Sequence, residues 1–97
     1  MTTLANVTVS SDDWIDIALT AGVQGSAFQM QNVSMTSYSD FNRVLMFKSN
    51  TKPSASAEDG HILYPAAYGP TSFITHDGTE KLWVKATKGT AVLSVSE

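Results

Sequence analysis

The side chains best suited to chemistry in this chain are its two histidines and a few carboxylates. His61 and His76 could bind a metal ion together with Asp59 or Asp77, because imidazole nitrogens and carboxylate oxygens are common zinc ligands. Neither histidine lies in a His-x-His or His-Glu-x-x-His spacing. Each lies beside an Asp-Gly pair, which is typical of a surface turn. The pattern therefore favours turn residues over a metal site.

The other chemical signatures of the chain are incomplete. Asp12, Asp13 and Asp16 could offer oxygen ligands to calcium, but the glycine and terminal glutamate of a calcium-binding loop are missing. We expect these acids to be solvated at the start of a strand. The chain has no Gly-x-Ser-x-Gly nucleophile motif. Residues 22–25 lack the lysine of a phosphate-binding loop. We therefore predict a protein that is not an enzyme and holds no cofactor.

The composition indicates one small domain with few charges. At 97 residues and 42% hydrophobic content, the chain can build one compact core but not two, which predicts a single domain over residues 1–97. Charged residues make up 15% of the chain, against roughly 25% in an average domain. The surface must therefore be rich in Ser, Thr, Asn and Gln. Because cysteine is absent, disulfides and thiolate metal sites are excluded.

Charge and hydropathy also limit the partners. The net charge is −3, and the only concentration of positive charge is Lys81, Lys85 and Lys88, so we predict no nucleic-acid binding. No run approaches the roughly 18 apolar residues of a membrane span. The N-terminus has neither a basic start nor an apolar export segment. We expect synthesis in the cytoplasm and no membrane partner.

Short alternating segments, separated by Gly, Pro, Asn and Ser, predict an all-β fold. In residues 14–20, we expect Ile15, Ile17 and Leu19 to face the core and Trp14 to face outward. The expected strands are residues 4–10, 14–20, 27–33, 42–49, 61–68 and 71–75, with two more in 81–97. About seven to eight short strands predict a small antiparallel β-sandwich or a flattened barrel.

The C-terminal stretch is predicted to form a hairpin. A two-residue turn at residues 88–89 would pair Val84 with Leu93 and leave one face of the hairpin wholly apolar. The same register places Trp83 and Lys85 on the other face. We expect a segment outside the hairpin to cover Trp83.

Composition also suggests roles for the less regular segments. Residues 49–60 have no large apolar side chain and predict a long loop, either mobile or acting as a contact arm. Residues 1–12 could be a flexible arm or an edge strand. Residues 42–49 are apolar on both faces, which predicts a central strand or one whose outer face meets a neighbour. Asn32 falls on a core face, where we expect its amide to satisfy backbone groups.

The two tryptophans are the side chains most suited to binding a partner. Alternation places Trp14 and Trp83 opposite the core, where large aromatic side chains favour an interface. Val92 and Lys85 share the face of Trp83 in the predicted hairpin. The tyrosines are expected to be half-buried anchors of their own sheets. The resulting hypothesis is an interface made of Trp14, Trp83, Val92 and Lys85. Tyr38, Tyr64 and Tyr68 are expected to anchor their own sheets and not to take part in it.

From residue 27 onward, the order of features resembles that of a known class of protein. It comprises Gln31-Asn32, an apolar strand at 44–47, Pro53 in a small-residue loop, Gly60 before a strand ending in Pro65, and Leu82-Trp83-Val84-Lys85 running through Gly89 to a last strand. This order resembles small structural proteins of tailed bacteriophages, of the head decoration, head fibre or minor virion type. The resemblance covers residues 27–97.

The resemblance implies a β-rich protein that fills a place in a virion. Such proteins work without a cofactor, bind capsid or other virion proteins, and assemble as homo-oligomers, with a trimer favoured. The expected location is the virion, after synthesis in the cytoplasm of a host bacterium. The alternative is a tail-associated module that binds a carbohydrate or receptor, with an exposed tryptophan stacking on a sugar ring. The resemblance transfers no catalytic residue.

Overall fold

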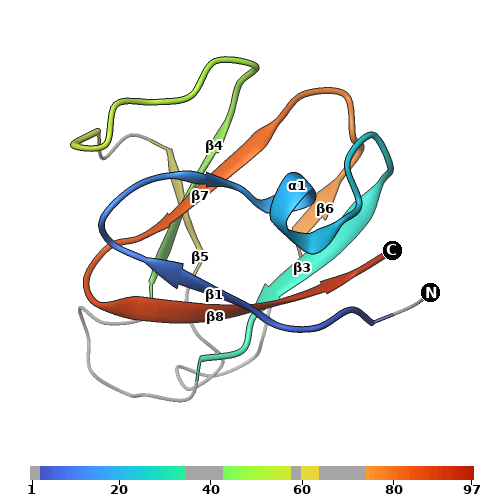
Figure 1. The fold of residues 1–97 in the computed structure, drawn as a ribbon, viewed down its shortest axis with the longest axis horizontal. Helices are drawn as coiled ribbons and strands as arrows, with labels where there is room; N and C mark the ends of the chain where they lie inside the picture. The colour runs from blue at the N-terminus through green and yellow to red at the C-terminus, as the bar shows by residue number, and fades with distance from the viewer. Residues whose placement is uncertain (1–2, 35–42, 58–59, 64–73) are drawn as a thin grey trace.

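Eight short strands and one short helix form the regular structure of the part of the chain described by this computed structural model, residues 3–34, 43–57, 60–63 and 74–97 (Figure 1). They form two four-stranded antiparallel sheets, with strand orders β1-β8-β3-β6 in the first sheet and β2-β7-β4-β5 in the second. The all-β sandwich predicted from the sequence is therefore confirmed. The elements are β1 (Val7–Ser10), β2 (Ile15–Asp16), α1 (Ile17–Ala21), β3 (Phe28–Asn32), β4 (Val44–Lys48), β5 (His61–Leu63), β6 (Ile74–His76), β7 (Leu82–Ala86) and β8 (Thr90–Ser96).

The core lies between the two sheets and is built from alternate residues of their strands. Val9 and Met30 of the first sheet and Val84 of the second are fully buried in it. Successive side chains of a strand point to opposite faces, so the alternation in the sequence sends these residues to one side. Burial alternates along β1 and β3, which agrees with the strands predicted at residues 4–10 and 27–33.

The prediction for the C-terminal hairpin is wrong about which strands pair, but it assigns the inward-facing residues correctly. β7 pairs with β2 and β4, whereas β8 pairs with β1 and β3. The turn between β7 and β8 therefore carries the chain from one sheet to the other. Val84 and Leu93 still face inward and are fully buried. Two apolar faces joined by a short turn can be buried across a sandwich as well as side by side.

The predicted strand at residues 14–20 is wrong beyond its first part. Only β2 pairs as a strand, and the chain continues directly into α1. The side chain of Asp16 accepts a hydrogen bond from the Leu19 backbone N–H and caps the helix. Leu19, predicted to face inward, is 61% exposed, whereas Ile17 is fully buried. Gly22 follows the helix with a φ of 81°, a left-handed conformation suited to glycine.

Two questions left open by the sequence are answered by β1 and β4. β1 is an edge strand of the first sheet, and β4 lies inside the second sheet between β7 and β5. Among the described residues, no helix has the length and apolar character needed to span a membrane. Some predictions lie outside the part of the chain that the structure describes, namely those on Tyr38, Asp59, Tyr64, Pro65 and Tyr68.

Candidate functional site

The outer face of the second sheet carries a cluster of aromatic side chains. Phe47 of β4 and Trp83 of β7 are register partners, so their side chains share this face. Lys85 lies on the same face because side chains alternate along β7. Trp14, just before β2, packs edge-on against Phe47 with ring centroids 6.3 Å apart. We call Trp14, Phe47, Trp83 and Lys85 the outer cluster.

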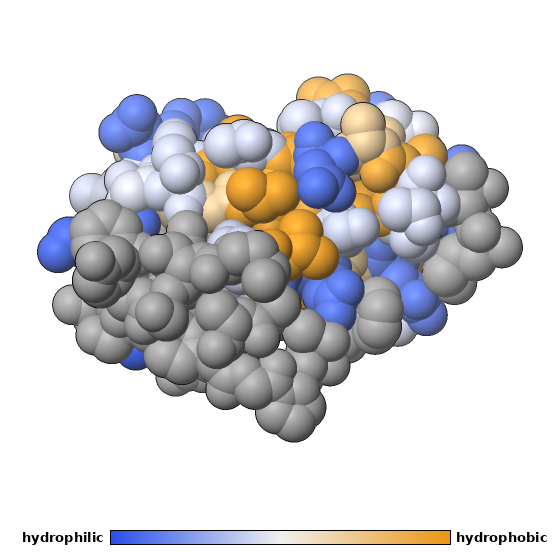
Figure 2. Space-filling model, turned by 90° about the horizontal axis from the view of Figure 1, so that it is seen from below, coloured by the Kyte–Doolittle hydropathy of each residue, from blue (hydrophilic) through white to orange (hydrophobic). Residues whose placement is uncertain are grey.

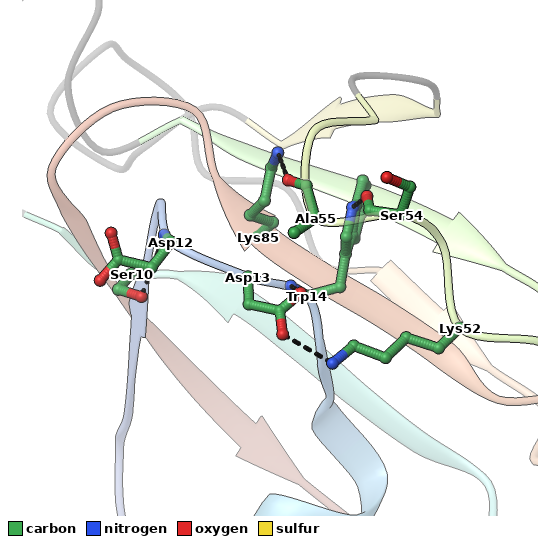
Figure 3. A network of polar contacts seen from close by, with 8 residues as sticks. All are labelled: Ser10, Asp12, Asp13, Trp14, Lys52, Ser54, Ala55 and Lys85. Atoms are coloured by element: carbon green, nitrogen blue, oxygen red, sulfur yellow. Dashed lines mark hydrogen bonds and ion pairs between the residues drawn. The ribbon is translucent and has the colours of Figure 1, made fainter.

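A loop of the same chain, residues 49–57, lies over the outer cluster. The Trp83 indole N–H donates to the Ser49 carbonyl oxygen at 2.9 Å. The Trp14 indole N–H donates to the Ser54 carbonyl oxygen at 3.0 Å, a contact visible in Figure 3. Both indole groups are therefore bonded to the backbone of this segment, which we call the covering loop. The expectation that another segment covers Trp83 is confirmed.

Lys85 fastens the far end of the covering loop. Its ammonium group donates to the carbonyl oxygens of Ala55 at 2.9 Å and Ala57 at 3.0 Å. It also lies 5.4 Å from the centroid of the Trp14 ring, close enough for a cation–π contact. The residue is only 6% exposed. A buried ammonium group needs acceptors in place of water, and the loop carbonyls supply them (Figure 3).

An ion pair ties the covering loop to the chain just before Trp14. Lys52 lies 2.6 Å from a carboxylate oxygen of Asp13, and the other carboxylate oxygen accepts from the Trp14 backbone N–H. The hydrogen bond from Lys52, and then that from Trp14, lowers the pKa of Asp13 below its ordinary value. Because both charged side chains are about half exposed, the pair adds little stability by itself. It marks the path of the loop (Figure 3).

The structure separates the residues of the hypothesised interface. Trp14 lies outside the core between the sheets, as predicted, but the covering loop leaves it 2% exposed, so little of it is accessible to a partner. Lys85 is buried by the same loop, and Trp83 is half-buried. Val92 is half-buried on the outer face of the first sheet, on the opposite side of the sandwich. The four residues therefore do not form one surface, since β7 and β8 belong to different sheets.

Two of the histidine and acidic residues considered from the sequence, His76 and Asp77, have structural roles. His76 is buried, packs against Phe28 with ring centroids 5.2 Å apart, and donates from Nε2 to the Glu80 carbonyl oxygen. It lines two hollows of about 190 and 250 Å³. Asp77 accepts from the backbone and hydroxyl of Thr79. In the part of the chain that the structure describes, no three potential metal ligands come together.

Asn32 joins the two sheets, a role that its position on a core face indicated in part. Its amide nitrogen donates to the Leu63 carbonyl oxygen of β5 at 3.2 Å. Its amide oxygen accepts from the Ser34 backbone N–H at 3.1 Å. The prediction that this amide satisfies backbone groups is confirmed. The link to the opposite sheet was not foreseen, because no local pattern shows which strand lies across from β3.

Beside the covering loop, the outer face of the second sheet carries two more apolar side chains, the buried Leu45 and the exposed Ile62. Leu45 is the register partner of Lys85 on one side and of Ile62 on the other. These residues and Thr87 line an open pocket of about 210 Å³. Ile62 is 44% exposed, although it is a large apolar side chain. Such a pocket suits an apolar side chain of a partner better than proton-transfer chemistry. Figure 2 shows apolar residues among polar ones on one face of the molecule.

Known proteins add nothing to this geometry. Comparisons of the chain with protein-family models, curated proteins and solved structures found no match. The interpretation of function therefore depends on the chain's own residues and on the resemblance described above.

Proposed function

We propose that this chain is a non-enzymatic structural protein of a phage virion, a capsid decoration or head-fibre component that acts by binding other protein chains. The observation that carries the proposal is that the buried ionisable side chains form hydrogen bonds within the fold. Asp16, His76 and Lys85 each bond to the backbone of their own chain. Side chains engaged in this way hold the fold together. We therefore infer that the protein acts through contacts made by the faces and edges of its sheets.

Several residues that carry the phage resemblance make contacts that stabilise the fold. Asn32 links the two sheets, and Trp83 bonds to the covering loop. Gly60 allows β5 to begin close to β4, because a Cβ at this position would lie 2.2 Å from the Met46 carbonyl oxygen. A class that shares such features is defined by shape rather than by chemistry, which supports a role in assembly.

The surface we assign to the shell contact is the part of the second sheet's outer face beside the covering loop, centred on the exposed Ile62. An exposed apolar side chain over an open pocket is typical of the centre of a protein–protein contact. Trp83 lies on the same face and remains partly accessible. The low proportion of charged residues, 15% of the chain, fits contact through flat surfaces.

The first test is to count copies of the chain in purified particles by quantitative mass spectrometry. A number close to that of the major shell protein is expected for a decoration protein. A few copies per particle would place the chain in a fibre or tail part instead. Absence from the particle would contradict the proposal.

The contact surface is tested by two matched variants, Ile62→Lys and Leu19→Lys. Both replace an exposed large apolar residue, but Leu19 lies on α1, away from the proposed surface. Ile62→Lys is expected to abolish rebinding of the purified chain to particles that lack it, because a charge would be buried against the shell. Leu19→Lys is expected to rebind normally. Equal binding by both variants would show that the surface is assigned wrongly.

A further inference from the structure

Among the residues that the structure describes, β1 pairs with a strand on one side only, so the backbone groups on its other side face away from the first sheet. β1 pairs on one side with β8, with Val9 opposite Ala91. The Ser11 backbone N–H continues this series by donating to the Gly89 carbonyl oxygen. In an antiparallel pair, hydrogen-bonded residues alternate along a strand. The backbone groups of Val7, Val9 and Ser11 therefore point to β8, and those of Thr8 and Ser10 point outward.

The pairing of β8 with β3 independently supports this assignment of inward and outward backbone groups on β1. The Val33 backbone N–H donates to the Val92 carbonyl oxygen, in register with the pairing of β3 and β8. Val92 and its alternate neighbours on β8 thus bond to β3, which leaves Ala91 and Leu93 to bond to β1. The outward direction of the Thr8 N–H and C=O groups follows from both sides of β8.

Nothing in the sequence of this edge opposes pairing with another strand. Residues 3–11 contain no charged residue and no proline, which are two of the devices that protect an edge strand. The register changes by one residue between Thr3, opposite Ser96, and Val7, opposite Leu93. This bulge confines regular pairing to β1 itself. Among the described elements, the other edge strands are shorter, with two residues in β2 and three each in β5 and β6.

We propose that β1 pairs with β1 of a second copy of this chain. The two strands would run antiparallel about a twofold axis and join the two first sheets into one continuous sheet. This pairing places Thr8 of one copy opposite Thr8 or Ser10 of the other. A second copy fits because the edge is self-complementary. Each outward donor meets an acceptor, and hydroxyl side chains face each other where like charges would repel.

This proposal names the self-association surface of the proposed function. It also changes the expected assembly, because a twofold pairing gives a dimer as the basic unit in place of the trimer favoured from the resemblance.

The test compares Thr8→Lys with the matched variant Thr75→Lys. Thr8 and Thr75 are both exposed and lie in the middle of the two edge strands of the same sheet. Sedimentation velocity of the full chain across a range of concentrations distinguishes a monomer of 10.4 kDa from a dimer. The wild type and Thr75→Lys are expected to be dimers. Thr8→Lys is expected to halve the mass, because it brings two ammonium groups close together across the paired strands.

A mixing experiment separates repulsion at the interface from a failure to fold. Thr8→Lys and Thr8→Glu are each expected to be monomeric alone and to form a mixed dimer when combined. Circular dichroism of each variant before mixing checks the fold. Recovery of the dimer on mixing is possible only if position 8 of one copy lies near position 8 of the other.

The outcomes that overturn the proposal are distinct from those that bear on the virion role. A wild type that is monomeric at every concentration, a trimer, or a Thr8→Lys variant that stays dimeric would each overturn pairing through β1. A monomeric chain that is abundant in particles would leave the proposed function standing. A dimeric chain that is absent from particles would support pairing through β1 and contradict the proposed function.

Discussion

The ammonium group of Lys85 lies 5.4 Å from the centroid of the Trp14 ring, and both side chains donate to one short stretch of the covering loop, between Ser54 and Ala57. Trp14 precedes the edge strand β2, whereas Lys85 belongs to the interior strand β7. The loop is thus held from two strands of the same sheet. Three carbonyl oxygens of a segment without large apolar side chains are satisfied in this way.

Replacement of Lys85 by methionine is expected to release this end of the loop. The variant keeps an unbranched apolar stem but leaves the carbonyl oxygens of Ala55 and Ala57 without their donor. The free energy of unfolding should fall by about 1–3 kcal/mol. Hydrogen exchange measured by mass spectrometry should be faster over residues 52–57. Lys81→Met is the control, because Lys81 is exposed, and it should leave exchange in the loop unchanged.

Replacement of Gly60 by alanine is expected to destabilise the fold more than the same change at Gly25. Both glycines have positive φ, 116° at Gly60 and 81° at Gly25. A Cβ at Gly60 would lie 2.2 Å from the Met46 carbonyl oxygen, whereas one at Gly25 would meet nothing within 4 Å. Gly25→Ala should cost about 1–2 kcal/mol from backbone strain alone. Urea unfolding should show a larger loss for Gly60→Ala, and equal losses would contradict the close approach of β4 and β5.

Replacement of Asn32 by leucine is expected to weaken the link between the sheets. The Leu63 carbonyl oxygen and the Ser34 backbone N–H would both lose a buried partner. Each unsatisfied group costs about 1–3 kcal/mol. Thermal unfolding should therefore occur at a clearly lower temperature. Gln31→Leu is the control on the same strand, because Gln31 is half-buried on the outer face. If both variants melted together, the amide of Asn32 would not be the link.

Asp77 is expected to make stability depend on pH in the acid range. The Thr79 backbone N–H, and then the Thr79 hydroxyl and Lys48, lower the pKa of Asp77 from 3.8 to about 2. A depressed carboxylate pKa contributes stability above the unfolded value, and that contribution is lost as the pH falls through the folded value. The loss should therefore lie between 3.8 and about 2. Nuclear magnetic resonance titration should give this pKa directly, and Asp77→Asn should make stability less sensitive to pH in that window.

The faces of most strands could be predicted from local alternation, and their neighbours could not. Val84 and Leu93 were assigned correctly to the core while their pairing was wrong, because alternation sets the side to which a residue points but not the strand that lies beside it. The short helix α1 was missed for a related reason. A single helical turn is too short to show a helical period.

The same division holds for the outer cluster. The sequence indicated that Trp14 and Trp83 lie away from the core and that residues 49–60 form a loop, and both predictions agree with the described residues. It did not show that the loop folds back over the tryptophans. The bonds that hold it there join an indole or ammonium donor to backbone carbonyl oxygens, and every residue of the loop offers the same carbonyl. Sequence therefore determined which side chains face inward or outward, through local periodicity. Only the tertiary structure decided which strands are neighbours and which surface stays open, because those choices depend on contacts between residues far apart in the chain.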